Sequence, residues 1–330
     1  MFPSENSHSI RIVSVVAALV ILAICTGAVA AQENDEVSLN QALTAGPNRP
    51  ANVPQGYVLT PFGYFDPSCV QKIAEGETLL ADGRVKHRDG TVAANVPVCR
   101  YPRYDRHGVA MVSGAPAQIN PEASGWIENA NVATGSAKEW YSGLVAFWVV
   151  PPQPPENNGQ VLFYFPGLED INDTLSILQP VLQWAGGQWA MANWNCCLNN
   201  ITTESTVIPV QPNDRIIGTI AGDCRSGRAP CASWTVFSFD ADSGESTTLK
   251  HTPSDGQVFN WAFGGVMEPY YVVSCDDYPA DTSLAFDVLL FDRHLRPIRD
   301  PSWSEAVNTT VTPQCNYGVK ASDYEVQVDY

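Results

Sequence analysis

The sequence predicts an all-β protein, built as a sandwich or a barrel. From residue 139 to residue 292, short apolar runs rich in Val, Ile, Thr, Phe, Tyr and Trp alternate with Gly, Pro, Asn and Asp. Several runs alternate apolar and polar residues, as strands with one buried face do. After the first 31 residues, no stretch keeps a 3.6-residue apolar period over three turns. Many short strands at near-regular spacing are typical of sandwiches and barrels.

The first element is a targeting segment, residues 1–31. Arg11 precedes the apolar run 12–24, and the small residues 27–31 follow it. This is the pattern of a cleaved signal peptide. The run is shorter than the roughly 20 apolar residues that a membrane span needs, although an uncleaved signal anchor is the alternative. We expect a secreted, extracellular protein with no membrane contact after signal cleavage.

Three further regions follow the signal peptide. Residues 32–54 are polar and aperiodic and are expected to form a flexible linker. Residues 55–138 contain short β-prone pieces and one expected short helix at 70–74, and we interpret them as an accessory or propeptide-like segment. Residues 139–330 form the predicted β-sandwich domain, although the tail after Arg293 is polar and has few strand signals.

Eleven runs carry the strand signals of the sandwich domain. The runs at 214–222 and 233–252 look like hairpin strands, and the second pair turns at residues 242–244. The predicted strands lie within residues 144–150, 160–168, 175–184, 188–194, 205–210, 214–222, 233–241, 245–252, 259–267, 270–275 and 283–292.

Cysteine usage agrees with export. Of the nine cysteines, Cys25 lies in the signal, and the remaining eight form an even set that indicates disulfides. We expect the local pairs Cys69–Cys99 and Cys224–Cys231. Cys196 and Cys197, as chain neighbours, are expected to bond to Cys275 and Cys315. A metal site is disfavoured because no CxxC pair and no His at ligand spacing is present, so we expect no metal and no cofactor.

The charge balance excludes some partners. The formal net charge of -17 is spread along the chain, whereas phosphate binding needs clustered Lys and Arg. We therefore expect no nucleic-acid partner, and a monomer. Asn172, Asn200 and Asn308 begin glycosylation triplets, which predicts a glycoprotein. No GxSxG hydrolase motif and no phosphate-binding loop is present.

Polar side chains inside the apolar runs are the candidate functional residues. Gln179 and Gln183 lie four positions apart in one run, so a strand would point both to the same face. Glu169 ends the run VLFYFPGLE, and Glu268 follows WAFGGVM. A buried amide or carboxylate without a partner costs roughly 1–3 kcal/mol or more. These residues therefore line a cleft or, alternatively, face water at strand surfaces and turns.

The order of these runs resembles the glutamic peptidases, or eqolisins. The resemblance rests on the run at 141–151 ending in Pro, on PGLED, on SILQ, on PNDRI and on FNWAFGGVME. It implies a concanavalin A-like antiparallel β-sandwich, or jelly roll, that is secreted with a propeptide and active in acid. It also implies a catalytic Gln at Gln179, paired with a Glu.

The resembling family's Glu-bearing strand corresponds here to QWAMANW, which carries Asn193 instead. An Asn cannot exchange a proton as a carboxyl does. The first hypothesis is therefore an acid-active endopeptidase that uses Gln179 with a displaced carboxylate, Glu268 or Glu169.

The alternative hypothesis is a secreted, non-catalytic module that binds carbohydrate or protein. Aromatic residues crowd the central region, and aromatic faces stack on sugars and clamp extended peptides. On both hypotheses the partner is a polypeptide or a glycan. The expected substrate-binding residues are Tyr164, Trp184, Trp189, Asn193 and Trp194.

Overall fold

The structure is a computed structural model that describes residues 39, 41–94, 98–111, 125–136, 138–172, 176–224, 228, 230–254 and 256–330. The chain divides into two units, residues 1–35 and 36–330, and every described residue belongs to the second. The expected signal peptide therefore lies outside the described residues. Among the described residues, no helix is long and apolar enough to cross a bilayer.

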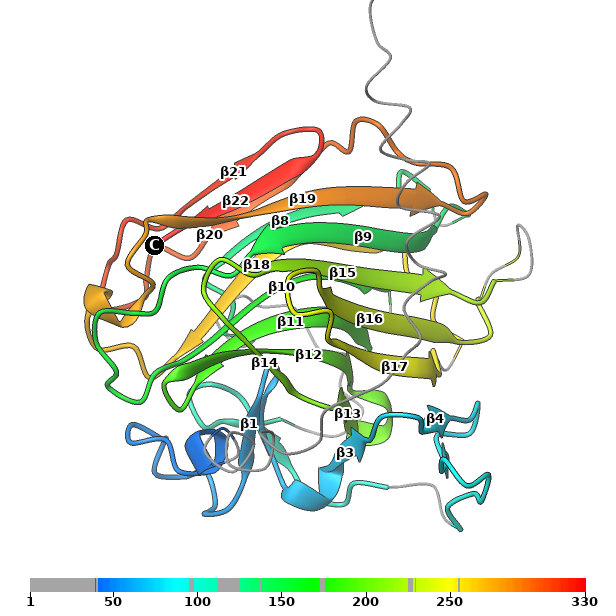
Figure 1. Ribbon diagram of the computed structural model, residues 1–330, viewed down its shortest axis with the longest axis horizontal. Helices are drawn as coiled ribbons and strands as arrows, with labels where there is room; N and C mark the ends of the chain where they lie inside the picture. Colours follow the sequence, from blue (N-terminus) through cyan, green and yellow to red (C-terminus); the bar gives the residue numbers. More distant parts are fainter. Residues whose placement is uncertain are drawn as a thin grey trace, which may run out of the picture. The chain divides into compact units, whose positions relative to one another are not determined.

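Two large sheets pack face to face and confirm the predicted all-β antiparallel sandwich (Figure 1). Every strand pair in the two sheets is antiparallel except the parallel pair of β3 with β13. The nine-stranded sheet runs β20 (Ser304–Val307), β8 (Glu128–Ala133), β18 (Trp261–Tyr270), β10 (Val161–Glu169), β11 (Ile177–Ala185), β12 (Gln188–Cys196), β13 (Thr202–Ser205) and β3 (Val70–Ile73), with β14 (Ile208–Val210) also on β12. The seven-stranded sheet runs β17 (Ser246–Thr252), β16 (Trp234–Asp240), β15 (Arg215–Gly222), β9 (Tyr141–Val149), β19 (Ser283–Asp292), β22 (Glu325–Asp329) and β21 (Gly318–Ala321).

The main core fills the space between the two sheets. In β16 every second residue is buried, which is the two-residue period of a strand with one face inward. Trp148 of β9 packs against Phe286 of β19, with ring centroids 5.5 Å apart. A large side chain that becomes fully buried contributes roughly 1.5–3 kcal/mol. This interior therefore accounts for much of the stability of the sandwich.

The N-terminal part packs on the outer face of the nine-stranded sheet, the face turned away from the seven-stranded sheet. A second apolar cluster joins Tyr57, Tyr64 and Trp126 to outer-face residues of β10, β11, β12 and β18. Leu39, Leu43 and Val53, from the stretch expected to be a linker, are buried in this cluster. The small elements of this part are β1 (Val58–Thr60), β2 (Gly63–Phe65), η1 (Pro67–Cys69), β4 (Thr78–Leu79), β5 (Val85–Lys86), β6 (Arg103–Tyr104) and β7 (Ala110–Met111).

The short helix expected at 70–74 is wrong, because this stretch is strand β3. Its residues Val70–Ile73 pair with Thr202–Ser205 of β13, a partner more than a hundred positions away. The long-range backbone hydrogen bonds of the sheet override the local preference of the segment. The N-terminal part therefore extends the nine-stranded sheet by one strand, as Figure 1 shows for β3 beside β13.

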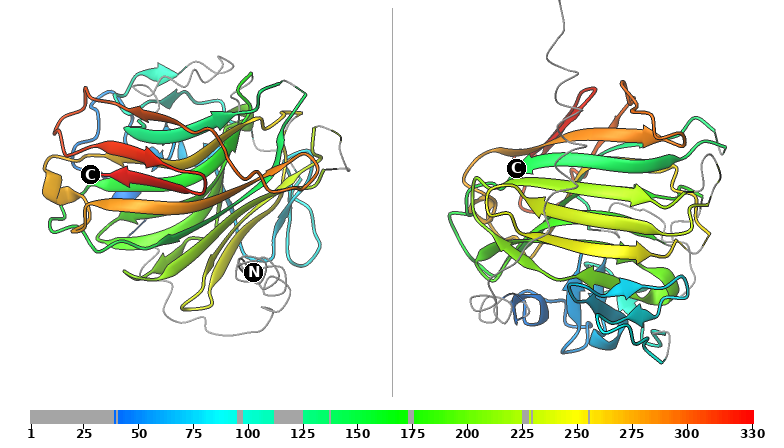
Figure 2. Two further views of the ribbon diagram at one scale, coloured as in Figure 1. Left: turned by 90° about the horizontal axis from the view of Figure 1, so that it is seen from above. Right: turned by 45° about the vertical axis from the view of Figure 1, so that its right-hand side comes forward.

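The C-terminal tail also differs from its prediction. Residues after Arg293 have few strand signals, yet they form β20, β21 and β22. β20 and β21 are short edge strands, where polar residues face solvent and the alternation of apolar residues is weak, and β22 lies between β19 and β21. Val326 and Val328 of β22 supply the buried face. The left view in Figure 2 shows these strands, in red, near the C-terminus.

Four disulfides link the described residues, and two of them confirm the expected pairs Cys69–Cys99 and Cys224–Cys231. The other expectation is wrong, because Cys196 bonds to its neighbour Cys197 and Cys275 bonds to Cys315. The peptide bond between Cys196 and Cys197 is cis, which places their Cα atoms 3.0 Å apart. The Cys196–Cys197 disulfide lies at the end of β12, just before η2 (Leu198–Asn200).

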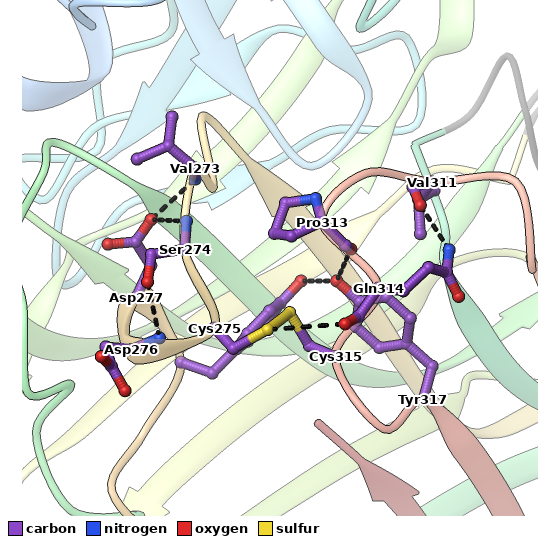
Figure 3. The surroundings of a disulfide bond; sticks show 11 residues. Val273, Ser274, Cys275, Asp276, Asp277, Val311, Pro313, Gln314, Cys315 and Tyr317 are labelled. Carbon is purple, nitrogen blue, oxygen red and sulfur yellow. Dashed lines mark hydrogen bonds between the residues drawn. A yellow bond between two sulfur atoms is a disulfide. The ribbon is translucent and has the colours of Figure 1, made fainter.

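The Cys275–Cys315 bond joins η3 (Cys275–Asp277) to the C-terminal tail (Figure 3). Next to it, the Tyr278 hydroxyl lies 3.0 Å from the Tyr317 hydroxyl, and Cys275 Sγ lies 3.6 Å from the carbonyl of Gln314. The tail strands are thereby tied to the end of β18. Disulfides of this number are typical of proteins that fold in an oxidising compartment.

Candidate functional site

Gln179 and Gln183 point to the same face of β11, as their spacing predicts. Ile177, Val181 and Ala185 of this strand belong to the outer cluster, whereas Leu178, Leu182 and Trp184 belong to the core between the sheets. Alternation along the strand therefore places both glutamines on the outer face. Pro180 lies between them and pairs with Asn193, so the strand continues through this proline.

Glu169 lies on the same outer face, on the neighbouring strand β10. It pairs directly with Ile177 of β11 and with Trp261 of β18, and both partners contact the outer cluster. Leu168 pairs with Leu178, and the same register continued by one residue puts Gly167, which precedes Leu168, level with Gln179. Glu169 is thus the diagonal neighbour of Gln179, at a typical Cα separation of about 7–8 Å, which long side chains can bridge. A Cβ on Gly167 would lie 3.2 Å from the Ile177 side chain and 3.2 Å from the Leu178 carbonyl, so the position beside this glycine is already filled.

Burial of the Glu169 carboxyl disfavours its charged form. Burial raises its pKa well above the usual value for a glutamate, and the charge of Asp170 raises it further. Its Oε2 atom is buried and has no hydrogen-bond partner. A buried carboxyl with a raised pKa holds its proton more tightly than a free glutamate does, so it can donate a proton in acid, and it can act as a base only where its pKa comes closer to the working pH.

Glu268 also lies on the outer face, but farther along it. It pairs with Phe163 of β10, which in turn pairs with Gln183 of β11. Glu268 is therefore level with Gln183 rather than Gln179, with a phenylalanine between them. Burial raises the pKa of Glu268 well above its usual value, although hydrogen bonds from Tyr270 and Trp126 partly oppose this shift. The Tyr270 hydroxyl donates to its Oε1 atom at 2.7 Å.

A third carboxylate of this face, Glu204, was missed by the sequence reasoning. It pairs with Trp194 of β12, which pairs with Gln179, so the three residues form one row across β11, β12 and β13. Lys72 of β3 lies 3.9 Å from its Oε2 atom. The stretch TTES is too short and polar to read as a buried strand. The stretch is buried because β13 pairs with β12 on one side and with β3 on the other.

The two glutamine side chains are the unusual feature of this face. Gln179 is 0% exposed, and neither its Oε1 nor its Nε2 atom has a hydrogen-bond partner. The same holds for Gln183. Buried polar groups are nearly always hydrogen-bonded in native proteins, and each unmade bond costs about 1–3 kcal/mol. These amides are therefore candidates for hydrogen bonds to a ligand or to water.

The N-terminal part covers this face. Trp126 packs edge-on against Phe263 and Phe165, with centroids 4.9 Å and 5.8 Å away. Phe263 of β18 pairs with Gly167 of β10, so the Trp126 indole packs one strand away from Gly167. Tyr64 packs against Tyr270, at 6.1 Å. The polar groups of the outer face are thus enclosed under aromatic side chains.

Four of the five expected substrate-binding residues lie on the other side of the sheet. Tyr164, Trp184 and Trp189 belong to the core between the sheets. Asn193 also points there, because its Nδ2 donates to the carbonyl of Thr247 and its Oδ1 accepts from Ser238. These residues therefore point away from Gln179, since neighbouring strand residues alternate between the two faces. Trp194 alone of the five lies on the Gln179 face.

One group of carboxylates could in principle hold a cation. Ligand atoms of Asp214, Asp240 and Asp242 lie within 4.8 Å of one another. Asp242 is bonded to Arg215 at 2.7 Å, and Asp240 accepts from the backbone of residue 242 and from the hydroxyl of Ser243. These contacts already use the carboxylates in a turn of the seven-stranded sheet, away from Gln179.

No known protein family and no curated protein matches the sequence. Solved structures match it. Scytalido-glutamic peptidase with a peptide-based transition-state analogue has 14% identity and a TM-score of 0.45, and the match covers 62% of this chain and 98% of that chain. The structural neighbours are glutamic peptidases.

Two further members of this set are similar. SCP-B, a member of the eqolisin family in complex with the tripeptide Ala-Ile-His, has 13% identity and a TM-score of 0.43, over 62% of this chain and 98% of that chain. Aspergilloglutamic peptidase from Aspergillus niger has 15% identity and a TM-score of 0.35, over 52% of this chain and 98% of that chain. At these identities the likeness to glutamic peptidases concerns the fold alone.

Proposed function

We propose that this chain is a secreted, glutamic-peptidase-like endopeptidase that is active in acid, with Gln179 and Glu169 as its catalytic pair. The observation that supports the proposal most strongly is the placement of an unpartnered, buried amide diagonally beside a buried carboxyl. The substrate would be a polypeptide.

In the proposed reaction, the carboxylate of Glu169 accepts a proton from water, and the resulting hydroxide attacks the carbonyl carbon of the peptide bond. The Nε2 atom of Gln179 donates a hydrogen bond to the oxygen on which negative charge develops. The carbon–nitrogen bond then breaks, and Glu169 returns the proton to the leaving amine.

The proposal requires that the N-terminal part leave the outer face, as a propeptide would. Gln179 is 0% exposed, so no substrate reaches it while the described part of residues 39–127 covers the sheet. Removal of this cover would hydrate Glu169, lower its pKa and let the carboxylate accept a proton at mildly acidic pH.

The test is digestion of a denatured protein by the full chain across the acidic range, followed by mass spectrometry. We expect cleavage to begin after a lag in which the chain loses its own N-terminal part, and to be absent in Gln179→Ala. The matched control is Gln183→Ala, which removes the neighbouring amide and should keep activity. Absence of cleavage by the wild type at every acidic pH, with the N-terminal part removed, would overturn the proposal.

The second candidate is a non-catalytic secreted module that binds polypeptide or carbohydrate. It is favoured by the residues directly opposite Gln179, which are Gly167 and Trp194 and not a carboxylate. Tryptophan fluorescence measures whether the chain without its N-terminal part binds peptides or glycans, and this measurement distinguishes the two candidates. Binding that persists in Glu169→Gln without any cleavage in the wild type supports the module.

A further inference from the structure

The outer face of the seven-stranded sheet, the face turned away from the nine-stranded sheet, is unusually apolar. Its strands β19, β9, β15, β16 and β17 lie side by side in the right view of Figure 2. Val149 is 49% exposed, and Val145, Phe147, Ile217 and Phe239 are half-buried. Solvent-facing sides of antiparallel sheets usually carry polar residues, and contiguous exposed apolar patches mark interaction sites.

One row crosses this face from apolar to acidic. Phe239 of β16 pairs with Ile217 of β15, and Ile217 pairs with Phe147 of β9. Phe147 pairs with Asp287 of β19, which pairs with Glu325 of β22. Directly paired residues point to the same side of a sheet. Three apolar side chains and two carboxylates therefore form a straight line across five strands, which we call the cross-strand row.

A groove of about 630 Å³ follows the acidic end of the cross-strand row. Ile217 and Phe147 line it, as do Asp287 and Glu325, and Arg215 is also among its lining residues. The remaining lining comes mainly from the end of β9 and the start of β19. The row is thus partly recessed and offers more contact area than a flat sheet face.

Some charged side chains of this face form ion pairs, whereas two carboxylates do not. Arg215 is bonded to Asp242 at 2.7 Å, and Lys320 to Asp329 at 2.6 Å. Asp287 and Glu325 form no ion pair with any described residue, although both are exposed and lie directly opposite each other. Like charges opposite each other across two strands are destabilising. A cation placed between them would relieve this repulsion.

We propose that the cross-strand row binds an extended, cationic polypeptide segment whose apolar side chains lie on Phe147 and Ile217 and whose Lys or Arg lies between Asp287 and Glu325. Charge complementarity selects this occupant. A second copy of the chain, with its net charge of -17, or an anionic surface would be repelled by the acidic end of the row.

The spacing of the row predicts the sequence pattern of the segment. Neighbouring strands are about 4.8 Å apart, so Phe147 lies about 7 Å from the midpoint between Asp287 and Glu325. Same-side residues of an extended peptide are about 6.6–6.8 Å apart. A basic residue should therefore follow an apolar residue by two positions, and a second apolar residue two positions earlier should reach Ile217.

The test uses three labelled seven-residue peptides and fluorescence anisotropy at neutral pH with the full Gln179→Ala chain. The first peptide has leucine at its second and fourth positions, lysine at its sixth and serine elsewhere. The second peptide has glutamate in place of lysine. The third peptide has its lysine at the fifth position, where it points away from the acidic pair. We expect the first peptide to bind at least about tenfold more tightly than the others, and added salt to weaken it.

Variants of the chain locate the site. We expect Asp287→Asn with Glu325→Gln to weaken the first peptide about tenfold, and Ile217→Thr to weaken it similarly. The matched control, Glu245→Gln with Asp300→Asn, removes the same charge elsewhere and should change binding by less than about twofold. Equal binding of the glutamate peptide, equal binding of the shifted-lysine peptide, or an unchanged affinity in the first double variant would overturn the proposal.

Discussion

Gln179 and Glu169 are diagonal neighbours on one face of adjacent antiparallel strands, and Gly167 occupies the position opposite the amide. Both side chains are buried, and each has polar atoms without a partner. Such a pair contributes nothing to stability as it stands, because desolvation of both groups is uncompensated. The arrangement is instead suited to a substrate that supplies the missing hydrogen bonds.

The unpartnered amide predicts that Gln179→Leu stabilises the full chain. Leucine fills similar space and removes two unsatisfied polar atoms, so the free energy of unfolding should rise by about 1–3 kcal/mol. Urea unfolding of the variant and the wild type measures this difference. A loss of more than about 1 kcal/mol would contradict it, since it would mean that the amide is hydrogen-bonded in the folded chain.

The opposite result is expected at Asn193. Its side chain accepts from Ser238 and donates to Thr247 across the two sheets, and its backbone N–H donates to the hydroxyl of Ser205. Asn193→Leu would leave two buried partners unsatisfied and should lower the free energy of unfolding by about 2–4 kcal/mol.

The direction in which Asn193 points also has a functional consequence. Because it faces away from Gln179, Asn193→Glu should not increase peptide cleavage. A gain of acid peptidase activity in Asn193→Glu, measured on a quenched fluorescent peptide, would show that the side chain reaches the outer face.

Three buried glutamates predict how stability depends on pH. Burial raises the pKa of Glu128 to about 9, and raises those of Glu169 and Glu268 well above the usual 4.5. Between the unfolded and folded pKa values, the folded chain holds more protons than the unfolded chain. Stability is therefore full below about pH 4.5 and falls as pH rises, by up to about 1.4 kcal/mol per pH unit for each group.

Chemical unfolding at several pH values measures this slope. Glu128→Gln should reduce it by the contribution of one carboxyl, whereas the exposed Glu325→Gln should leave it unchanged. Stability that rises from pH 4.5 to neutrality in the wild type would contradict the account.

The packing of the N-terminal part predicts an effect of Gly125→Ala. Gly125 has a φ of +90°, and a Cβ there would lie 2.8 Å from Oε1 of Glu268. Strain of this kind costs about 1–3 kcal/mol, so the cover should loosen and amide hydrogen exchange in β18 should speed up. Gly135→Ala is the control, because a Cβ there meets nothing within 4 Å. Equal exchange in both variants would show that residue 125 does not hold the cover.

The central strands and their facing residues could be predicted from the sequence. A two-residue period places Gln179 and Gln183 together, and the turn at 242–244 separates β16 from β17 as expected. Which side of the sheet they face could not be predicted, because β10, β11 and β12 are apolar on both faces. The outer face of these strands is apolar because the N-terminal part packs on it. The sequence of the strands themselves does not reveal that the N-terminal part covers them.

Long-range pairing explains the remaining differences. Val70–Ile73 is a strand because of its partner β13, and the polar tail forms strands because β8, β19 and β22 offer edges to it. We expected Tyr164, Trp184 and Trp189 in a binding cleft. Aromatic residues occur both in cores and in clefts, and the sequence alone does not distinguish the two. Strand register assigns them to the core.

The most direct test of the proposed function compares Glu169→Gln with Glu268→Gln, after removal of the N-terminal part, on a quenched fluorescent peptide in acid. Loss of a general base lowers the rate by about 10²–10⁴-fold. The account predicts that loss for Glu169→Gln and a far smaller change for Glu268→Gln, because only Glu169 is the diagonal neighbour of Gln179. Full activity in Glu169→Gln would contradict it.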